Sequence, residues 1–315
     1  MTRRRAAIEA RGLATHRGVM TPTKTITRDE KRDERRGDGP AILVTGGSGK
    51  TGRRVASRLA ARGRPVRIGH RSGEPPFDWA EPATWAPALR GVQAAYLVYY
   101  PDLGVPEAAP VVRAFAERAV ASGVRRLVLL SGRGEEHVLP AEQAVRESGA
   151  AWTILRGAWF CQNFDEGWLL EPVLGGEIVL PAGDVAEPFV DADDVADVAV
   201  AALTEEGHAG QIYELTGPRL VTFAEAAAAI GRASGREVCY EAVTRQEYAA
   251  VLARGGVPAE HVEFLTDLLT HVLDGHNAHL ADGVERALGR PARDFADYAR
   301  AAAAAGAWRQ DGPRP

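Results

Sequence analysis

The sequence predicts an α/β protein in which a doubly wound parallel sheet is joined to a smaller C-terminal α+β region. Short apolar segments alternate with helical segments from residue 41 onward, and a glycine-rich turn directly follows the first of them. The chain of 315 residues, 45% apolar and 25% charged, has the composition of an ordinary globular protein. Strands that alternate with helices form a parallel sheet covered on both faces, with ligands at the carboxyl ends of the strands.

Hydrophobic periodicity places the elements in order. We expect strands at 41–45, 65–69, 94–98, 126–131, 152–156 and 211–217. We expect helices at 51–61, 106–122, 138–148, 191–203, 222–234, 245–255 and 292–308, and a leucine-rich helix within 261–279. The helix at 191–203 has Asp191 or Asp193 as its N-cap and Val195, Val198 and Ala202 on its core face.

Charge and cysteine content narrow the function classes. The net charge of -4 and the pI of about 6.1 favour neither nucleic acid nor an anionic membrane as a partner. No apolar run approaches the roughly 20 residues that span a bilayer. Cys161 and Cys239 fit neither a disulfide framework nor a metal cluster. We therefore expect a cytoplasmic monomer or homodimer that binds a small molecule.

The stretch VTGGSGKTG at 44–52 has two interpretations. A nucleotide-splitting loop needs G-x-x-x-x-G-K-[ST], but its first glycine would fall on Val44, inside the predicted strand. The glycines at 46, 49 and 52 form G-x-x-G-x-x-G instead, between a strand and a helix. Such glycines allow a tight turn and bring backbone N–H groups close to a pyrophosphate. The stretch therefore predicts a dinucleotide site in a Rossmann-like fold.

The end of the second predicted strand indicates which dinucleotide is bound. An NAD-binding fold usually has an acidic residue there, which binds the ribose 2′-OH. This strand ends in Gly69-His70-Arg71-Ser72, and only Glu74 follows as an acidic candidate. An arginine can pair with a 2′-phosphate, so we expect NADP rather than NAD.

Several longer motifs resemble one protein family. These are VTGGSGKTG, the strand end at Arg71, FDW at 77–79, LVLLSGRG at 127–134, WTILRGAWFCQNF at 152–164 and PFVDADDVADVA at 188–199. Together they resemble the NmrA-like branch of the atypical short-chain dehydrogenases over residues 41 to about 308. Within that branch they are similar to the clavine reductases of ergot alkaloid pathways, of the agroclavine dehydrogenase and festuclavine synthase type.

This resemblance assigns roles to residues of the chain. It implies that the pyrophosphate is held by Gly46, Ser48, Gly49, Lys50, Thr51 and Gly52, and the 2′-phosphate by Arg71 and Ser72. It places Asp78 and Trp79 beside the adenine, and Tyr99 and Ser131 near the ribose and nicotinamide. It further implies that the segment with Arg156, Trp159, Phe160, Asn163 and Trp168 crosses the cofactor and binds the substrate, Asn163 and Trp168 following at helical spacing.

We therefore expect four parts of the chain. They are a disordered tail at 1–39, an NAD(P)-binding domain at 40–157, a substrate-capping region at 158–308 that is interleaved with the sheet, and a tail at 309–315. The first tail has dense mixed charge and few large apolar residues. Its arginines at 3–5 are not followed by the apolar segment of a signal peptide, and Met20 is an alternative start.

The usual catalytic pair of short-chain dehydrogenases is missing from the sequence. That pair is Tyr-x-x-x-Lys, in which the lysine lowers the tyrosine pKa for proton transfer. The only lysines are Lys24, Lys31 and Lys50, and no tyrosine lies between Tyr100 and Tyr213. Tyr99, Tyr100, His137 and Glu135 are the remaining candidates for a proton donor, since they lie near the predicted strand ends.

Two functions are compatible with this absence. A reductase can deliver hydride to an acceptor that needs no proton at that moment, such as a cyclic iminium ion or a quinone of secondary metabolism. Alternatively, the protein binds NADP(H) without turnover and regulates a partner, as NmrA regulators do. No metal is expected: capping explains the aspartates at 191–197, and His261, His271, His276 and His279 lack a metal-ligand spacing.

Overall fold

The computed structural model describes residues 39–309, except for the side chains of Glu260, Phe264 and Leu268. The tail expected at 1–39 lies outside the described residues apart from Gly39, and so does all of the C-terminal tail except Arg309. No helix in the described part of the chain is long and apolar enough to cross a membrane.

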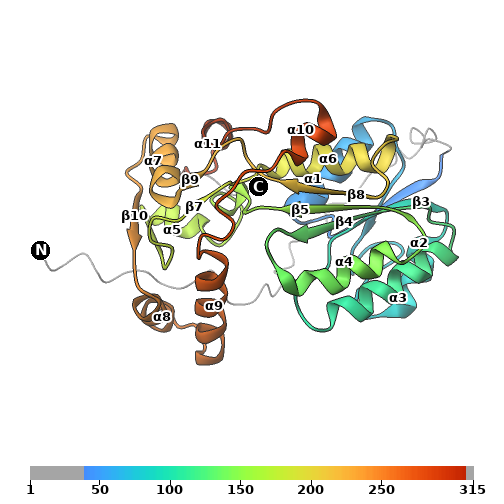
Figure 1. The fold of residues 1–315 in the computed structure, drawn as a ribbon, viewed down its shortest axis with the longest axis horizontal. Helices are drawn as coiled ribbons and strands as arrows, with labels where there is room; N and C mark the ends of the chain where they lie inside the picture. The colour runs from blue at the N-terminus through green and yellow to red at the C-terminus, as the bar shows by residue number, and fades with distance from the viewer. Residues whose placement is uncertain (1–38, 310–315) are drawn as a thin grey trace, which may run out of the picture.

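A six-stranded parallel sheet forms the centre of the larger lobe (Figure 1). Its strands, in spatial order, are β2 (Val66–Gly69), β1 (Ala41–Thr45), β3 (Val92–Leu97), β4 (Arg126–Gly132), β5 (Ala151–Gly157) and β8 (Gln211–Leu215). Each neighbouring pair is parallel, as predicted. The strand order reverses between β1 and β3, so a crevice for a ligand is expected at the carboxyl ends of these two strands.

Helices cover both faces of the sheet, which confirms the doubly wound architecture (Figure 1). One face carries α1 (Lys50–Ala61), α6 (Ala192–Thr204) and α10 (Gly283–Leu288), and the other carries α2 (Trp85–Leu89), α3 (Ala108–Ala121) and α4 (Leu139–Arg146). Asp191 is the N-cap of α6, where its carboxylate accepts a hydrogen bond from the Asp193 N–H at 2.8 Å. Val195, Val198 and Ala202 are buried on the core side of that helix, as predicted.

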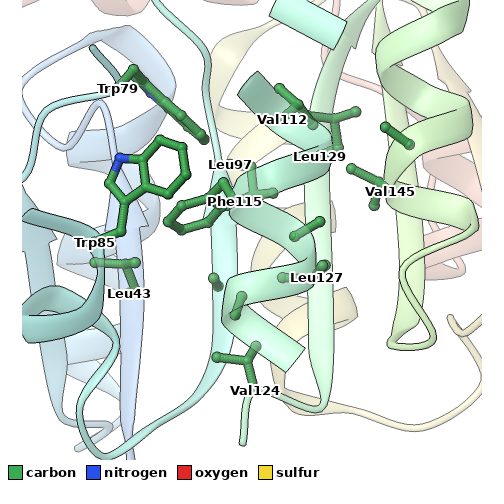
Figure 2. Packing of buried hydrophobic residues seen from close by; sticks show 14 of the residues in the cluster. Leu43, Trp79, Trp85, Leu97, Val112, Phe115, Val124, Leu127, Leu129 and Val145 are labelled. Atoms are coloured by element: carbon green, nitrogen blue, oxygen red, sulfur yellow. The ribbon is translucent and has the colours of Figure 1, made fainter. Parts of the chain in front are cut away.

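Aromatic side chains fill the core between the sheet and α3 (Figure 2). The Phe115 ring lies 4.9 Å from that of Trp79, 5.5 Å from that of Trp85 and 5.6 Å from that of Phe77, centroid to centroid. Burial of four aromatic rings stabilises this layer strongly, because each ring removes about 150–250 Å² from water. The core therefore fixes the loop after β2 against the sheet.

The smaller lobe has its own core. Its elements are α5 (Leu170–Gly175), β6 (Glu177–Leu180), β7 (Ala186–Glu187), β9 (Val221–Thr222), α7 (Phe223–Ser234), β10 (Cys239–Ala242), α8 (Arg245–Arg254), α9 (Ala259–Val272) and α11 (Phe295–Ala304). Phe164, Phe189, Phe223 and Phe295 are fully buried at its centre, with ring centroids 5.4–6.3 Å apart. Because α6, β8 and α10 pack on the large sheet, the second half of the chain contributes to both lobes.

The structure corrects one expected element. Residues 158–169 contain no α-helix: Asn163 ends a short 3-10 turn at Cys161–Asn163, and Trp168 lies in the irregular segment after it. Main-chain pairing accounts for this. The Val190 N–H donates to the Trp159 carbonyl at 2.8 Å, and the Cys161 N–H donates to the Val190 carbonyl at 2.9 Å. The four short strands of the smaller lobe were not predicted, because two to four residues carry no readable periodicity.

Candidate active site

The glycine turn after β1 is shaped by close main-chain contacts. Gly46 has a φ of 61°, in the left-handed region that favours glycine. A Cβ on Gly52 would lie 2.2 Å from the Gly46 carbonyl oxygen, and a Cβ on Gly47 would lie 2.6 Å from the Ile68 side chain. Gly46 itself lies against Val98 at the end of β3. The turn therefore sits at the β1–β3 switch point, where the strand order predicts a ligand.

The start of α1 leaves its main-chain donors free for an anion. Gly49 is the N-cap and offers no side-chain acceptor, and the first turn contains no acidic residue. Ser48 and Gly49 are exposed, whereas Thr51 and Gly52 are buried. Unpaired N–H groups at a helix N-terminus bind phosphate without further help. These residues fit the pyrophosphate of a dinucleotide.

Lys50 lies beside the turn, and it is partly buried. Burial lowers the pKa of its amine, while Glu166 and Asp165 nearby partly offset this effect. Its Nζ lies close to Gly167, where an added Cβ would come within 3.1 Å of it. Lys50 therefore connects the glycine turn to the 165–167 segment, and its expected contact with the phosphates stays a prediction.

Arg71 and its neighbours form the turn after β2. Arg71 is exposed and has no hydrogen bond or ion pair to another described residue, which leaves its guanidinium available for a phosphate. The Ser72 hydroxyl lies 2.9 Å from His70 Nδ1. Asp78 Oδ1 accepts from the Ala80 N–H at 3.0 Å, and the buried Trp79 donates its indole N–H to the Val98 carbonyl at 3.0 Å. The contact of Asp78 and Trp79 with adenine stays a prediction.

A cavity of about 350 Å³ lies beyond the carboxyl ends of β3, β4 and β5. Six residues that the sequence assigned to the cofactor or substrate line it: Tyr99, Ser131, Trp159, Phe160, Asn163 and Trp168. The Trp159 and Trp168 rings meet edge to face with centroids 6.1 Å apart. The leucine-rich helix α9 contributes Val272 of its last turn. The cavity therefore has walls from both lobes and is large enough for a small organic molecule.

The candidate proton donors are distributed unevenly around this cavity. Tyr99 and Glu135 line it, whereas Tyr100 is 75% exposed and, like the exposed His137, does not. Partial burial, and secondarily Glu107, raise the pKa of Tyr99. Burial, and secondarily Asp102, raise the pKa of Glu135. No lysine lines the cavity among the described residues, so Tyr99 lacks the partner that would lower its pKa.

Arg156 forms an ion pair instead of lining the cavity. Its guanidinium donates to both oxygens of Glu142, at 2.9 and 2.6 Å, and the Ser131 hydroxyl donates to Glu142 Oε1 at 2.7 Å. Glu142 is 2% exposed, and this contact is the main reason that the pKa of Arg156 is raised. Arg156 therefore supports the floor beneath Ser131, and its expected contact with substrate stays a prediction.

Arg133 is a buried arginine that lines the cavity, and each of its three guanidinium nitrogens donates a hydrogen bond. It donates to the carbonyls of Asn277 and His279 at 2.9 Å each and to Glu214 Oε2 at 3.2 Å. Asn277 Nδ2 donates back to the Arg133 carbonyl at 3.3 Å. These bonds join the end of β4 to the segment after α9, so Arg133 holds the two lobes together along one side of the cavity.

Glu187 on β7 is the most unusual group in the cavity wall. It is 0% exposed, and neither of its carboxylate oxygens has a hydrogen-bond partner among the described residues. Burial raises its pKa to about 7, although Arg133 and His276 act in the opposite direction. Sequence reasoning missed Glu187 and Arg133 as site residues, although Arg133 stands in the LVLLSGRG motif, because only the fold brings them to the cavity. It also missed Glu142, whose role depends on its contacts with Ser131 and Arg156.

The aspartates of α6 pair with arginines. Arg58 of α1 donates to Asp193 and Asp197 at 2.6 Å each, and Arg290 donates to Asp197 at 2.7 Å. These ion pairs engage Asp193 and Asp197, and those with Arg58 fix α1 against α6.

Comparison with known proteins identifies the family. No family model matches the chain. The oxidoreductase YesF of Bacillus subtilis is 35% identical to it over 84% of this chain and 95% of its own length. The NAD(P)H azoreductase of Xenophilus azovorans is 33% identical over 84% of this chain and 98% of its own length, and the agroclavine dehydrogenase of Claviceps fusiformis is 32% identical over 82% and 95%. The chain belongs to the NmrA-like branch of the atypical short-chain dehydrogenases. It is an NAD(P)H-dependent oxidoreductase by class.

Solved structures agree with the fold of this family. The triphenylmethane reductase of Citrobacter sp., in a complex with NADP(H), superposes with a TM-score of 0.66 at 23% identity, over 83% of this chain and 99% of that one. NmrA, a negative transcriptional regulator in complex with NAD, superposes with a TM-score of 0.61 at 16% identity, over 84% and 95%. At these identities the likeness concerns the fold alone.

Proposed function

We propose that the protein is an NADPH-dependent reductase that transfers hydride to a small organic acceptor needing no proton from the protein. A cyclic iminium ion or a quinone-like molecule of secondary metabolism is such an acceptor. The observation that carries this proposal is the composition of the cavity beside the glycine turn. It contains aromatic side chains and Tyr99, but no lysine among its described residues and no tyrosine of lowered pKa.

In this proposal, each part of the site has a separate role. The glycine turn and the start of α1 hold the pyrophosphate, and Arg71 pairs with the 2′-phosphate, which favours NADPH over NADH. When bound, the cofactor supplies a hydride, with its two electrons, from the reduced nicotinamide. Trp159, Trp168 and Tyr99 enclose the acceptor and exclude water. Holding the two reacting atoms roughly 3–3.5 Å apart is then the main contribution of the protein.

An iminium acceptor completes this reaction without an acid. Hydride adds to the iminium carbon, the π electrons of the C=N bond move to nitrogen, and the product is a neutral amine. In contrast, a ketone would give an alkoxide, which needs a proton donor with a matched pKa. The lack of a lysine beside Tyr99 therefore selects the acceptor class.

Relatives support the same class of chemistry. The named relatives include an azoreductase and an agroclavine dehydrogenase, and the solved neighbours include an NADPH-dependent quinone oxidoreductase of Escherichia coli. The aromatic-lined cavity beside the glycine turn supports an enzyme over a cofactor-binding regulator, which has no need of a substrate site. A cytoplasmic location and a monomeric or homodimeric state stay predictions.

NADPH oxidation by the purified protein tests the proposal. We expect turnover with a cyclic iminium ion or a quinone, and none with an aldehyde of similar size. Tyr99→Phe should cost less than the roughly 10²–10⁴-fold loss that follows removal of a general acid. Tight NADPH binding without turnover of any acceptor would contradict the proposal and favour the regulator.

A further inference from the structure

We propose that Glu187 is the counter-ion for a positively charged acceptor, so that the cavity selects a cationic iminium over a neutral quinone. This inference deepens the reductase function proposed above and rests on it. Glu187 ends β7 and is fully buried in the cavity wall, with both carboxylate oxygens unpaired among the described residues.

An unpaired buried carboxyl group destabilises a folded protein unless a ligand uses it. Buried polar groups are nearly always hydrogen-bonded, because leaving one unpaired costs its full desolvation free energy. Glu142, which is buried beneath Ser131 of the cavity wall, accepts three hydrogen bonds from Ser131 and Arg156. The chain thus satisfies one buried glutamate completely and leaves the other, in the cavity wall, without a hydrogen-bond partner among the described residues.

Arg133 lowers the pKa of Glu187 but does not form an ion pair with it. Arg133 lines the same cavity, but its three donor groups already bond to Glu214, Asn277 and His279. No ion pair joins Arg133 to Glu187 within the described residues. The attraction between them is therefore only partial, and Glu187 keeps both oxygens for a ligand.

The whole cavity is suited to a cation. Its lining contains three carboxyl groups, those of Asp102, Glu135 and Glu187, against the single guanidinium of Arg133. Trp159 and Trp168 also line the cavity, and the faces of aromatic rings attract cations. A neutral quinone, whose oxygens gain negative charge on reduction, would meet carboxylates instead of donors. An iminium nitrogen would meet complementary charge.

The role of Glu187 as a counter-ion predicts that its loss changes KM and kcat differently. Hydride transfer removes the positive charge of the acceptor, so the counter-ion stabilises the bound substrate more than the transition state. Glu187→Gln should therefore raise the KM for an iminium ion about tenfold to a hundredfold and leave its kcat unchanged or slightly higher. A proton donor at this position would behave differently, because its loss would lower kcat.

The pH profile gives a second signature. The charged groups that face Glu187 are Arg133 and His276, which lower its pKa, and Asp274, which raises it; Glu135 and Asp102 share the cavity. A permanent cation binds the ionised carboxylate, so its affinity should rise as pH increases through about 7 and then level off. The profile should flatten in Glu187→Gln and persist in Glu135→Gln.

The experiment uses the full chain and three probes. N-methyl dihydroisoquinolinium is a permanently charged acceptor, menadione is a neutral quinone, and N,N-dimethyl tetrahydroisoquinolinium is a cation that cannot be reduced. Kinetics with NADPH are measured for the first two, and calorimetric binding to the NADPH-free protein for the third. Wild type, Glu187→Gln and the surface control Glu177→Gln are compared, with thermal unfolding to show that each is folded.

Each outcome decides one question. The inference holds if Glu187→Gln weakens binding of both cations while menadione kinetics stay within about twofold and Glu177→Gln behaves as wild type. Equal effects on cation and quinone, or no effect on either, overturn it. A collapse of kcat with menadione also overturns it, since Glu187 would then donate a proton. If the wild type reduces neither acceptor but binds the inert cation through Glu187, the reductase proposal fails and the cation site stands.

Discussion

The glycine turn at 46–52 offers its ligand main-chain N–H groups, whereas the cavity beyond it offers side chains from distant parts of the chain. In the turn, chemistry depends on the absence of side chains: Gly52 has no room for a Cβ, and Gly49 leaves the helix start uncapped. In the cavity, Glu187, Arg133 and Trp168 come from separate segments that only the fold assembles. Backbone sites resist most substitutions and fail by steric clash, while side-chain sites can change specificity without loss of the fold.

The first prediction concerns the backbone site and should give the largest effect. Gly52→Val should abolish cofactor binding, because even a Cβ would lie 2.2 Å from the Gly46 carbonyl oxygen and the turn would have to move. Gly175→Val is the matched control, since a Cβ there has nothing within 4 Å. Titration of cofactor fluorescence measures both. Wild-type affinity in Gly52→Val would show that the turn does not hold the pyrophosphate.

The second prediction concerns Glu142, the paired glutamate beneath Ser131 of the cavity wall. Glu142→Ala removes the partner of Arg156 and Ser131 from a buried site, so it should lower the free energy of unfolding by about 3 kcal/mol. Glu147→Ala is the control at the end of the same helix, where its pair with Arg113 is half exposed, and it should leave the urea midpoint unchanged. A loss in Glu142→Ala no greater than in the control would show that the buried pair is not needed for the fold.

The contrast between turn and cavity also explains what could be predicted from the sequence. Local signals in the sequence predict strands β1 to β5, helices α1, α3 and α6 and the glycine turn. These signals are the hydrophobic periodicity, the Asp191 N-cap and the glycine spacing. The aromatic wall at Trp159 and Trp168 was expected from the resemblance to the family. The carboxyl groups were not, because the burial of Glu187 depends on pairing between β7 and β9, strands of two residues each. Long-range contacts of this kind produce no periodic pattern in the sequence.

The third prediction concerns stability at the unpaired glutamate. Folding raises the pKa of Glu187 from 4.5 to about 7, so the folded state retains a proton that the unfolded state releases between these values. The cost of its buried charge is therefore absent below about pH 4.5 and complete above about pH 7, where it reaches at most about 3 kcal/mol. Glu187→Gln should be more stable than wild type at about pH 8, and this gain should shrink at about pH 5.

Thermal unfolding of both proteins across that range measures the difference. If Glu142→Ala lowers the thermal stability and Glu187→Gln raises it, the result would be the strongest support for a structural role of Glu142 and a ligand-binding role of Glu187. Destabilisation by Glu187→Gln at high pH would mean that the carboxylate has a partner in the folded protein.

The last prediction returns to the cofactor site, at the exposed side chain of Arg71. Arg71 can pair with the 2′-phosphate of NADPH, and a charge-assisted hydrogen bond of this kind is worth about 1.5–3 kcal/mol. Because the guanidinium is exposed, water and salt screen the pair, so the lower end of that range applies and the effect is about tenfold in affinity. Arg71→Ala should weaken NADPH binding by this factor and leave NADH binding unchanged, since NADH has no 2′-phosphate. In the wild type, the same titration at high salt should reduce the difference in affinity between NADPH and NADH. If wild-type protein binds NADH and NADPH equally at low salt, Arg71 does not select the cofactor, and the main-chain turn alone determines its affinity.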